Sequence, residues 1–319
     1  MLIAECCQNH LGDSSILDRM VEAGALAGAT HLKIQGLYAD ELTFREQFEE
    51  NRESRYSNYI VRPHAAEVAR LKALTLNPSV EEAFVRKCRD HNVTPMISVF
   101  SHLGVNRAID AGFRSFKIAS YDCSSLELIS RLLPYSDELV ISTGATYWHE
   151  VAATAKYVAE NKLPSTRIAL LHAVTEYPTQ IESVRLLRMA ALKRFGFEVG
   201  FSDHTSPQTS GLGATALSIK LGGTVVERHF TILETGATKD GPVSVNPSQL
   251  EQISKMLRDS HFLLDFLPSE EEVISMMAPL HSLQPSEIEL QNREYYRGRV
   301  ASVHRDKLIY SWEYWPSET

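Results

Sequence analysis

Two apolar stretches of the chain end in side chains that can bind a metal. The stretch GGTVVERHF, residues 222–230, runs from two valines into Glu227, Arg228 and His229, and the stretch GFSDH ends in His204. Two imidazoles on neighbouring strands can hold a divalent metal and leave coordination positions for water or substrate. His204 and His229 therefore predict a metal site, although two ligands alone define it weakly.

Lysines and serines in other apolar stretches predict an anion site. Lys33 in HLKIQ and Lys117 in SFKIAS supply point charges that suit a phosphate or a carboxylate. The hydroxyl groups of Ser120, Ser142 and Ser202 can add hydrogen bonds to the same anion. The expected ligand is a small phosphorylated anion.

These side chains need strands to position them, and eight short apolar runs recur with helical patterns between most of them. The runs are residues 2–7, 31–35, 94–100, 115–120, 138–144, 167–173, 198–204 and 224–230. Their spacing, about 20 to 35 residues, is typical of βα units. The pattern predicts an α/β fold, a closed (β/α)8 TIM barrel with its active site where the strands end. An open doubly wound sheet is the main alternative.

Alternation along a strand predicts which side chains face the barrel axis. Glu227 and His229 share one face with Val225, whereas Arg228 points to the other face, where we expect a structural pair with a helix carboxylate. The same rule aligns Gly200 with Ser202 and His204, Lys33 with Gln35, and Glu5 with Cys7. If these faces point inward, the barrel mouth holds two lysines, two histidines and two glutamates.

The sequence predicts one large domain followed by a short extension. We expect residues 1–266 to form the barrel domain and residues 267–319 to form a C-terminal helix and tail extension, because the periodicity weakens there. Residues 37–64 form a long charged excursion that is typical of a lid or binding loop, with a solvated insertion as the alternative. The stretch GLGATA resembles a dinucleotide fingerprint but lies inside a helical pattern, so we interpret it as helix packing.

Composition and charge restrict the class of protein. The 319 residues are 44% hydrophobic and 23% charged, as in ordinary globular proteins, and the net charge of −8 argues against nucleic acid or anionic membrane as a partner. The four cysteines, Cys6, Cys7, Cys88 and Cys123, have neither zinc-site nor disulfide spacing. With no signal peptide and no membrane-length apolar run, we expect a soluble cytoplasmic protein.

Eight motifs in chain order together resemble the sialic acid synthase family, which makes nonulosonic acids from phosphoenolpyruvate and an aldose. They span roughly residues 2 to 260 and read AECCQNHLGD, LKIQ, FKIASYDCSSLELI, LVISTGAT, LLHAVTEYP, GFSDHT, GATALSIKLGGTVVERHF and KDGPVSVNPSQL. The resemblance implies a TIM-barrel transferase that forms a carbon–carbon bond, uses a divalent metal, Mn²⁺ or Mg²⁺, and assembles as a homodimer. Its products would be phosphate and a nonulosonic-type 2-keto acid.

The resemblance also implies roles for individual residues. His204 and His229 match the metal ligands, and Glu5 and Glu227 match acidic residues beside the reacting carbons. Tyr177, Asp240 and Asp122 match positions on the side of the acceptor sugar. The positions that cradle phosphoenolpyruvate are matched by Lys33, Gln35, Lys117, Ser120, Ser142 and Ser202, with Ser98 as a further phosphate contact.

Departures from the family pattern lie on the acceptor side. Family members often have Asn at Thr175, Glu at Asp122, and Gly-Pro at Thr238 and Lys239. They also continue into an antifreeze-like domain that lends an arginine to the partner's acceptor site, and we expect this chain to lack that domain. The tail offers Arg293, Arg297 and Arg299, but tail arginines are usually solvated, so we leave them out of the predicted site. A changed acceptor is the resulting hypothesis.

Cys7 raises a separate question, because it stands where the family commonly has Gly. It can act as a third metal ligand, as a cysteine does in related sugar-phosphate synthases, or it can pack as a small hydrophobic side chain.

Two alternative functions follow from the same residues. The first is a synthase that uses a phosphorylated sugar, which needs a second cationic cluster, with Arg45, Arg52, Arg55 and Arg62 as the obvious source. The second is a non-catalytic barrel that binds ligands without turnover. No metal or phosphoenolpyruvate position has been replaced, which favours the enzyme.

Overall fold

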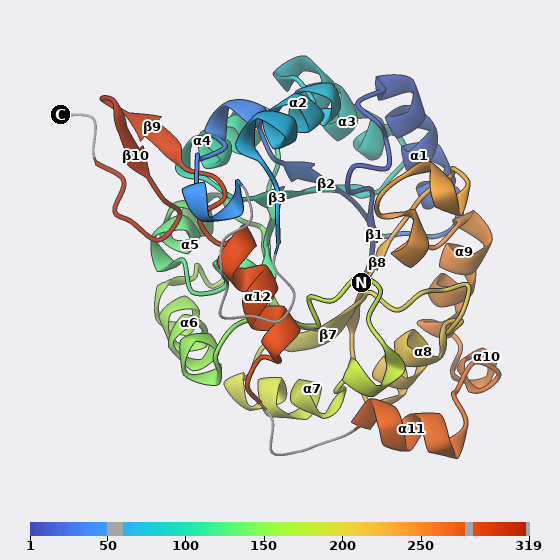
Figure 1. The fold of residues 1–319 in the computed structure, drawn as a ribbon. Coiled ribbons are helices and arrows are strands. Elements are labelled where there is room, and N and C mark those ends of the chain that lie inside the picture. Colours follow the sequence, from blue (N-terminus) through green and yellow to red (C-terminus); the bar gives the residue numbers. More distant parts are fainter. Residues whose placement is uncertain (50–59, 278–282, 317–319) are drawn as a thin grey trace.

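The eight predicted strands form one closed parallel barrel. We describe a computed structural model that covers residues 1–49, 60–277 and 283–316. Each strand pairs with its sequence neighbours, and β8 returns to pair with β1, as Figure 1 shows in a view down the barrel. The strands are β1 (Leu2–Glu5), β2 (His31–Gly36), β3 (Thr94–Val99), β4 (Ser115–Ile118), β5 (Glu138–Ser142), β6 (Arg167–Ala173), β7 (Glu198–Asp203) and β8 (Val225–His229). The TIM-barrel prediction is confirmed, and the open sheet is excluded.

Helices surround the barrel. They are α1 (Ser14–Leu26), α2 (His64–Leu74), α3 (Pro78–Asp90), α4 (His102–Asp110), α5 (Leu126–Leu132), α6 (Trp148–Asn161), α7 (Leu187–Leu192), α8 (Gly213–Lys220), α9 (Pro247–Met256), α10 (Ser260–Leu264) and α11 (Glu270–Met277). Of these, α1 to α8 connect the strands, and α9 to α11 follow β8. Local sequence explains their starts, because Asn77 and Asn246 cap α3 and α9 with their side chains and a proline follows each. The GLGATA stretch leads into α8, so its interpretation as helix packing holds.

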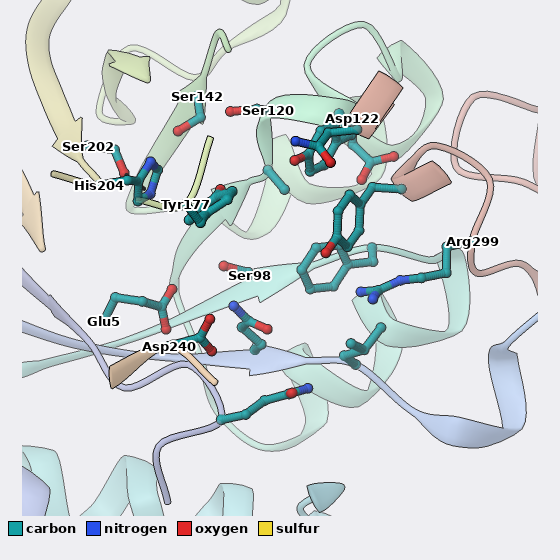
Figure 2. A pocket seen from close by; sticks show the side chains of 18 of the residues that line it. Glu5, Ser98, Ser120, Asp122, Ser142, Tyr177, Ser202, His204, Asp240 and Arg299 are labelled. Carbon is teal, nitrogen blue, oxygen red and sulfur yellow. Dashed lines mark hydrogen bonds between the residues drawn. The ribbon is translucent and has the colours of Figure 1, made fainter. Parts of the chain in front are cut away.

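Inside the barrel, an apolar layer lies below a polar one. Ile3, Met96, Val140, Ala169, Leu171 and Val225 pack together and fill the lower interior. Two residues further along β1, β3 and β5 the inward side chains become polar, and Figure 2 shows these residues, Glu5, Ser98 and Ser142, together with Ser202 of β7 around the pocket. The apolar layer seals the barrel, so the polar side chains above it face only the open upper end.

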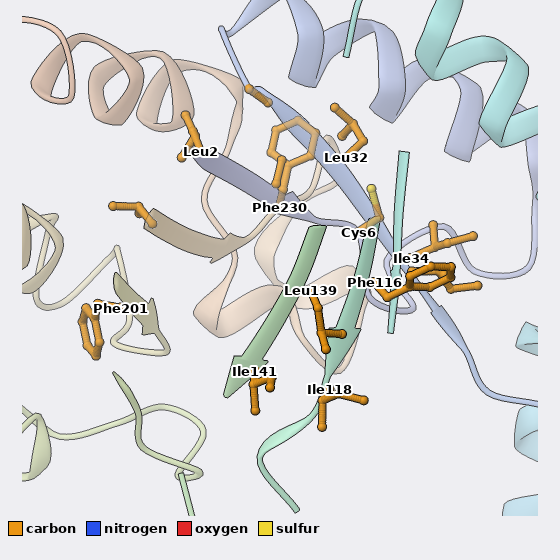
Figure 3. Close-up of a cluster of buried hydrophobic side chains, with 14 of the residues drawn as sticks. Leu2, Cys6, Leu32, Ile34, Phe116, Ile118, Leu139, Ile141, Phe201 and Phe230 are labelled. Carbon is orange, nitrogen blue, oxygen red and sulfur yellow. The ribbon is translucent and has the colours of Figure 1, made fainter. Parts of the chain in front are cut away.

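The outer faces of the strands form the main core with the helices. Figure 3 shows this packing for side chains such as Leu2, Leu32, Phe116 and Phe201. Cys6 lies in this outer core, one residue before Cys7. Cys7 follows the end of β1 in a left-handed backbone conformation and lies against His229, so the two adjacent cysteines have different environments.

The C-terminal segment folds back over the barrel opening. It contains α12 (Glu287–Tyr296) and a hairpin of β9 (Ser302–His304) and β10 (Lys307–Ile309). Figure 1 shows α12 lying across one side of the opening. Asn292 Nδ2 donates to the carbonyl of Thr175 at 2.6 Å, and the guanidinium of Arg293 pairs with Glu150 at 2.6 Å. A boundary at residue 266 stays a prediction, but the tail is attached to loops above the barrel.

The charged excursion after β2 contacts this tail. In its described part, Leu42 forms a bridge with Val300, and the N–H of Thr43 donates to the carbonyl of Arg299 at 3.0 Å. Arg45 donates to carbonyls at the C-terminus of α12, including that of Tyr295 at 2.5 Å. These contacts are not those of a solvated insertion. Arg52 and Arg55 lie outside the described residues.

Among the helices in the described parts of the chain, none is both long enough and apolar enough to cross a lipid bilayer.

Candidate active site

A cavity of about 680 Å³ opens at the C-terminal ends of the barrel strands, as Figure 2 shows from close by. All fourteen side chains that the sequence predicts for the site line this cavity: Glu5, Lys33, Gln35, Ser98, Lys117, Ser120, Asp122, Ser142, Tyr177, Ser202, His204, Glu227, His229 and Asp240. The structure therefore brings the whole predicted set together, and their individual roles follow from the contacts below.

A buried carboxylate links two strands at the bottom of the cavity. Glu227 accepts hydrogen bonds from Lys117 Nζ at 2.8 and 2.9 Å and from Ser202 Oγ at 2.7 Å. Burial alone would raise the pKa of Glu227, but the positive charges of Lys117 and Lys33 outweigh it and lower that pKa below its usual range. Glu227 is therefore ionised at neutral pH.

Lys33 extends this network towards β1 and β3. Its ammonium group pairs with Glu5, donates to Ser98 Oγ at 2.9 Å and lies 3.6 Å from Glu227 Oε2. Burial lowers the pKa of Lys33 to about 7, although the charge of Glu227 opposes this change. The affinity of this position for an anion therefore depends on pH near neutrality.

Three potential metal ligands converge where β1 and β8 end. One ligand atom each from Cys7, His229 and Asp240 lies within 4.8 Å of the others, and Cys7 Sγ is 3.2 Å from His229 Nδ1. Cys7 adopts a left-handed φ of 45°, unusual for a residue with a Cβ, and its N–H donates to Glu5 Oε1 at 2.7 Å. Sulfur, imidazole and carboxylate form a donor set that suits a divalent transition metal. The residues present thus fit Mn²⁺ better than Mg²⁺, the two metals that the sequence resemblance implies, because Mg²⁺ prefers oxygen ligands.

The second predicted metal ligand, His204, stands beside this group. Its Nδ1 donates to the carbonyl of Val174 at 2.9 Å, which leaves Nε2 as the free lone pair, 3.3 Å from Ser202 Oγ. The ring of His204 lies edge-on to that of His229 with 5.1 Å between centroids. Burial lowers the pKa of both histidines, that of His204 to about 4, so both imidazoles are neutral and can bind a metal. A metal role for His204 stays a prediction.

Further residues line the cavity besides the fourteen that the sequence places in the site, and of these the sequence singles out Arg62 only as part of a second cationic cluster and Lys239 only as a departure from the family pattern. The tail supplies Gln291, Asn292, Tyr296 and Arg299 to the cavity wall, helix α2 supplies Arg70, and the segments that follow the strands add Gln8, Arg62, Tyr121, Glu176 and Lys239. A solvated Arg299 is expected from the sequence, whereas the structure places it on the cavity wall. Arg293 and Arg297 point elsewhere and pair with Glu150. The available signal was the run of aromatic and basic residues near position 296.

Asp122 is held in place by hydrogen bonds from two serine side chains, one of them in the C-terminal tail. Its Oδ1 accepts hydrogen bonds from Ser311 Oγ in the tail at 2.8 Å and from Ser125 Oγ at 3.4 Å. Burial raises the pKa of Asp122 to about 6. The side chain therefore connects the tail to the barrel as well as lining the cavity.

Arg228 is structural, as predicted, but its partner differs from the prediction. Its Nη1 lies 2.5 Å from Asp203 Oδ2, and both side chains are fully buried. The carboxylate comes from the neighbouring strand β7 and not from a helix, because Asp203 and Arg228 are register partners in the barrel sheet.

The chain was compared with known proteins. A sequence model described as the NeuB family matches residues 20–265, most of the barrel. The chain belongs to the NeuB family. It is therefore a synthase of the NeuB type, a transferase that condenses phosphoenolpyruvate with a second substrate to form nonulosonic acids.

Individual relatives of this NeuB-family chain have low sequence identity to it, but the similarity covers most of each chain. It is 25% identical to the N,N'-diacetyllegionaminic acid synthase of Campylobacter jejuni over 81% of this chain and 75% of that protein. It is 26% identical to the enzyme of the same name in Legionella pneumophila over 97% and 84% of the two chains. The solved structure of a spore coat polysaccharide biosynthesis protein of Bacillus subtilis covers 92% of this chain and 77% of its own, with a TM-score of 0.72 at 21% identity. That similarity shows the barrel fold alone.

Proposed function

We propose that this NeuB-family protein joins phosphoenolpyruvate to the aldehyde carbon of an open-chain aldose, an amino or deoxy sugar related to N-acetylmannosamine, and releases phosphate and a nonulosonic-type 2-keto acid. The observation that carries the proposal is the network of Lys117, Lys33, Glu227 and Ser202 at the bottom of the cavity. It combines two cations for phosphate with a fixed anion in one small buried volume.

Phosphoenolpyruvate binding rests on lysine and serine side chains. Lys117 and Lys33 supply positive charge, and the hydroxyls of Ser120, Ser142 and Ser202 lie on one side of the cavity in Figure 2. An ammonium group and several hydroxyl donors suit a phosphate, because charge-assisted hydrogen bonds to phosphate oxygens are the stronger ones. The apolar layer beneath the network keeps water from entering the barrel from below.

A divalent metal would be held by His229 together with Cys7, Asp240 and His204. When bound, it would polarise the aldehyde oxygen of the acceptor as a Lewis acid, and manganese or magnesium is the proposed ion. The neutral imidazoles of His204 and His229 have lone pairs available for this purpose. Glu5 supports the ligand Cys7 by accepting the hydrogen bond of its N–H.

The bonds change in two stages. C3 of phosphoenolpyruvate forms a bond to the aldehyde carbon, which leaves positive charge at C2, and the ionised carboxylate of Glu227 stabilises that charge. Water then adds at C2, oriented by Glu227, and the tetrahedral intermediate expels phosphate by cleavage of the C2–O bond. The lysines stabilise the departing phosphate, and the remaining C2 oxygen becomes the keto group of the product.

The same proposal places the reaction in the cytoplasm. All four cysteines, Cys6, Cys7, Cys88 and Cys123, are buried as free thiols. Unpaired thiols suit a reducing compartment.

The test is a turnover assay. The protein is incubated with phosphoenolpyruvate, Mn²⁺ and a panel of free and phosphorylated aldoses, and phosphate and new 2-keto acid are measured together. Equal amounts of both products, formed only when an acceptor is present, are expected. Absence of phosphate release with every acceptor would overturn the proposal, and release that survives both chelation and His229→Ala would overturn the metal assignment.

A further inference from the structure

Four cationic side chains gather on the outer wall of the cavity, away from the lysines at its bottom. They are Arg62 in the loop after β2, Arg70 on α2, Lys239 in the loop after β8 and Arg299 in the C-terminal tail, and all four line the cavity. We call these four residues the rim cluster. Tyr296 lies at its centre, with its hydroxyl 3.0 Å from Arg62 Nη1 and its ring 4.9 Å from Arg299 Cζ.

The rim cluster carries more positive charge than the protein neutralises around it. Within the described parts of the chain, Glu67 is the only carboxylate within 4 Å of any of the four cations, where it pairs with Arg70 at 2.7 Å and lies 3.6 Å from Arg299. Burial would raise the pKa of Tyr296, yet Arg62, Arg299 and Lys239 lower it. A positive potential strong enough to lower the pKa of a buried phenol also attracts an anion.

The cluster is also held rigidly in place. The residues flanking Arg299 are bonded to the loop after β2, since Thr43 Oγ1 donates to the carbonyl of Gly298 at 2.8 Å and Val300 bridges Leu42. Arg70 is held by two hydrogen bonds to Glu67 and one to Gln8. Side chains held in advance lose little conformational freedom when they bind a ligand.

The rim cluster is separate from the inner anion site. Figure 2 shows Arg299 on the opposite side of the cavity from Ser202 and His204, with Ser98 and Tyr177 between them. A single phosphoenolpyruvate held by Lys117 and the serines therefore does not reach the rim cluster, whose four cations have Glu67 as their carboxylate partner among the described residues. The cavity thus offers two anion positions at its two ends, one for each substrate.

We propose that the acceptor is a phosphorylated aldose whose phosphate ester, remote from the aldehyde, binds the rim cluster. This inference rests on the proposed function, because the aldehyde end must reach the inner site. A phosphate dianion matches the excess of cations better than a carboxylate, and guanidinium groups bind phosphate through paired hydrogen bonds. The tail helix α12 and the residues after it complete this site within the same chain.

The experiment compares N-acetylmannosamine with N-acetylmannosamine 6-phosphate, which differ only in the phosphate. We expect kcat/KM to be higher for the phosphorylated sugar by about tenfold or more, and this preference to shrink as salt is raised. Arg299→Gln should remove most of the preference, and Arg299→Lys should retain part of it. The matched control is Arg305→Gln, which changes an exposed arginine of the tail hairpin that does not line the cavity.

A binding measurement keeps the inference separate from catalysis. Calorimetric titration of each sugar into protein saturated with phosphoenolpyruvate, without added metal, should show tighter binding of the 6-phosphate in the wild type and not in Arg299→Gln. Equal binding and equal turnover of the two sugars would overturn the rim assignment, as would a preference for an aldose with a carboxylate in place of the phosphate. If no sugar is turned over, the proposed function fails, while the titration still decides the rim assignment.

Discussion

Lys117 and Glu227 form an ion pair that crosses the interior of the barrel. Lys117 lies on β4 and Glu227 on β8, which stand on opposite sides of the eight-stranded ring, and Lys117 Nζ lies 2.8 and 2.9 Å from the two carboxylate oxygens. A contact between opposite strands requires both side chains to reach towards the axis. The pair therefore lies at the bottom of the cavity and places a negative charge beside Lys33 and Lys117, the lysines that we propose bind phosphate.

Replacing Glu227 by Gln should impair catalysis more than binding. The amide keeps a hydrogen-bond acceptor for Lys117 but removes the charge that stabilises C2, so we expect kcat to fall about 100-fold or more. KM for phosphoenolpyruvate should not rise, because both lysines lose a competing anion. Steady-state phosphate release measures both constants, and an unchanged kcat with a raised KM would contradict the assigned role.

The control for this variant is Glu138→Gln at the lower end of the same barrel. Glu138 pairs with His31 at 2.6 Å and does not line the cavity. Burial would raise its pKa, but the hydrogen bonds of His31, Ser115 and Arg167 lower that pKa to about 2. This substitution should lower the unfolding temperature while kcat stays close to that of the wild type.

Phosphoenolpyruvate affinity should fall as pH rises through neutrality. The pKa of Lys33 is about 7, so the side chain is charged below that pH and becomes neutral above it. Loss of one proton that binding requires weakens affinity by up to about tenfold per pH unit above the pKa. Titration calorimetry from about one pH unit below the pKa of Lys33 to about two units above it should show this decline in the wild type and not in Lys33→Met. A decline of the same size in both proteins would assign it to another group.

Cys7→Ser should weaken metal binding. Because the sulfur of Cys7 lies 3.2 Å from His229 Nδ1, we expect a loss of about 10- to 100-fold in metal affinity. Titration with Co²⁺ tests the contact directly, since a bound thiolate gives a sulfur-to-cobalt charge-transfer absorption that the variant should lack. Cys6→Ala is the matched control, because Cys6 packs in the outer core. The same absorption in Cys7→Ser and wild type would exclude the cysteine as a ligand.

Asp203→Asn should destabilise the fold without touching the cavity. It would leave the fully buried guanidinium of Arg228 without its counter-charge, and breaking a buried pair in this way costs about 3 to 5 kcal/mol. Urea unfolding measures the free energy of unfolding directly. A loss below about 1 kcal/mol, the range of exposed pairs, would show that Thr205 and Val243 carbonyls suffice for Arg228.

The barrel could be predicted from the sequence because each strand can be recognised from its own few residues and their neighbours. The apolar runs are short and most are separated by a helical pattern, so Lys33, Lys117 and Glu227 can be placed on inward faces by counting residues. Since parallel strands of a barrel all end at one rim, side chains far apart in the chain were expected to meet, and the structure places all of them on one cavity.

The outer part of the site could not be predicted in the same way. Arg299 lies on the cavity wall because Val300 pairs with Leu42 and because Arg45 holds the end of α12, and neither contact has a periodic signal. Cys7 reaches His229 only through a left-handed backbone turn after β1 ends at Glu5. Such positions depend on long-range pairing and local backbone geometry, which residue spacing does not encode.

The most direct test of the central claim follows the oxygen that joins carbon and phosphorus in phosphoenolpyruvate. The enzyme is supplied with phosphoenolpyruvate labelled with heavy oxygen at that bridge, together with Mn²⁺ and the acceptor panel, and the products are examined by phosphorus NMR and mass spectrometry. Addition of water at C2 followed by C–O cleavage predicts that the released phosphate retains the label and that its release requires an acceptor. Label found in the organic product, or phosphate released equally well without an acceptor, would contradict the account.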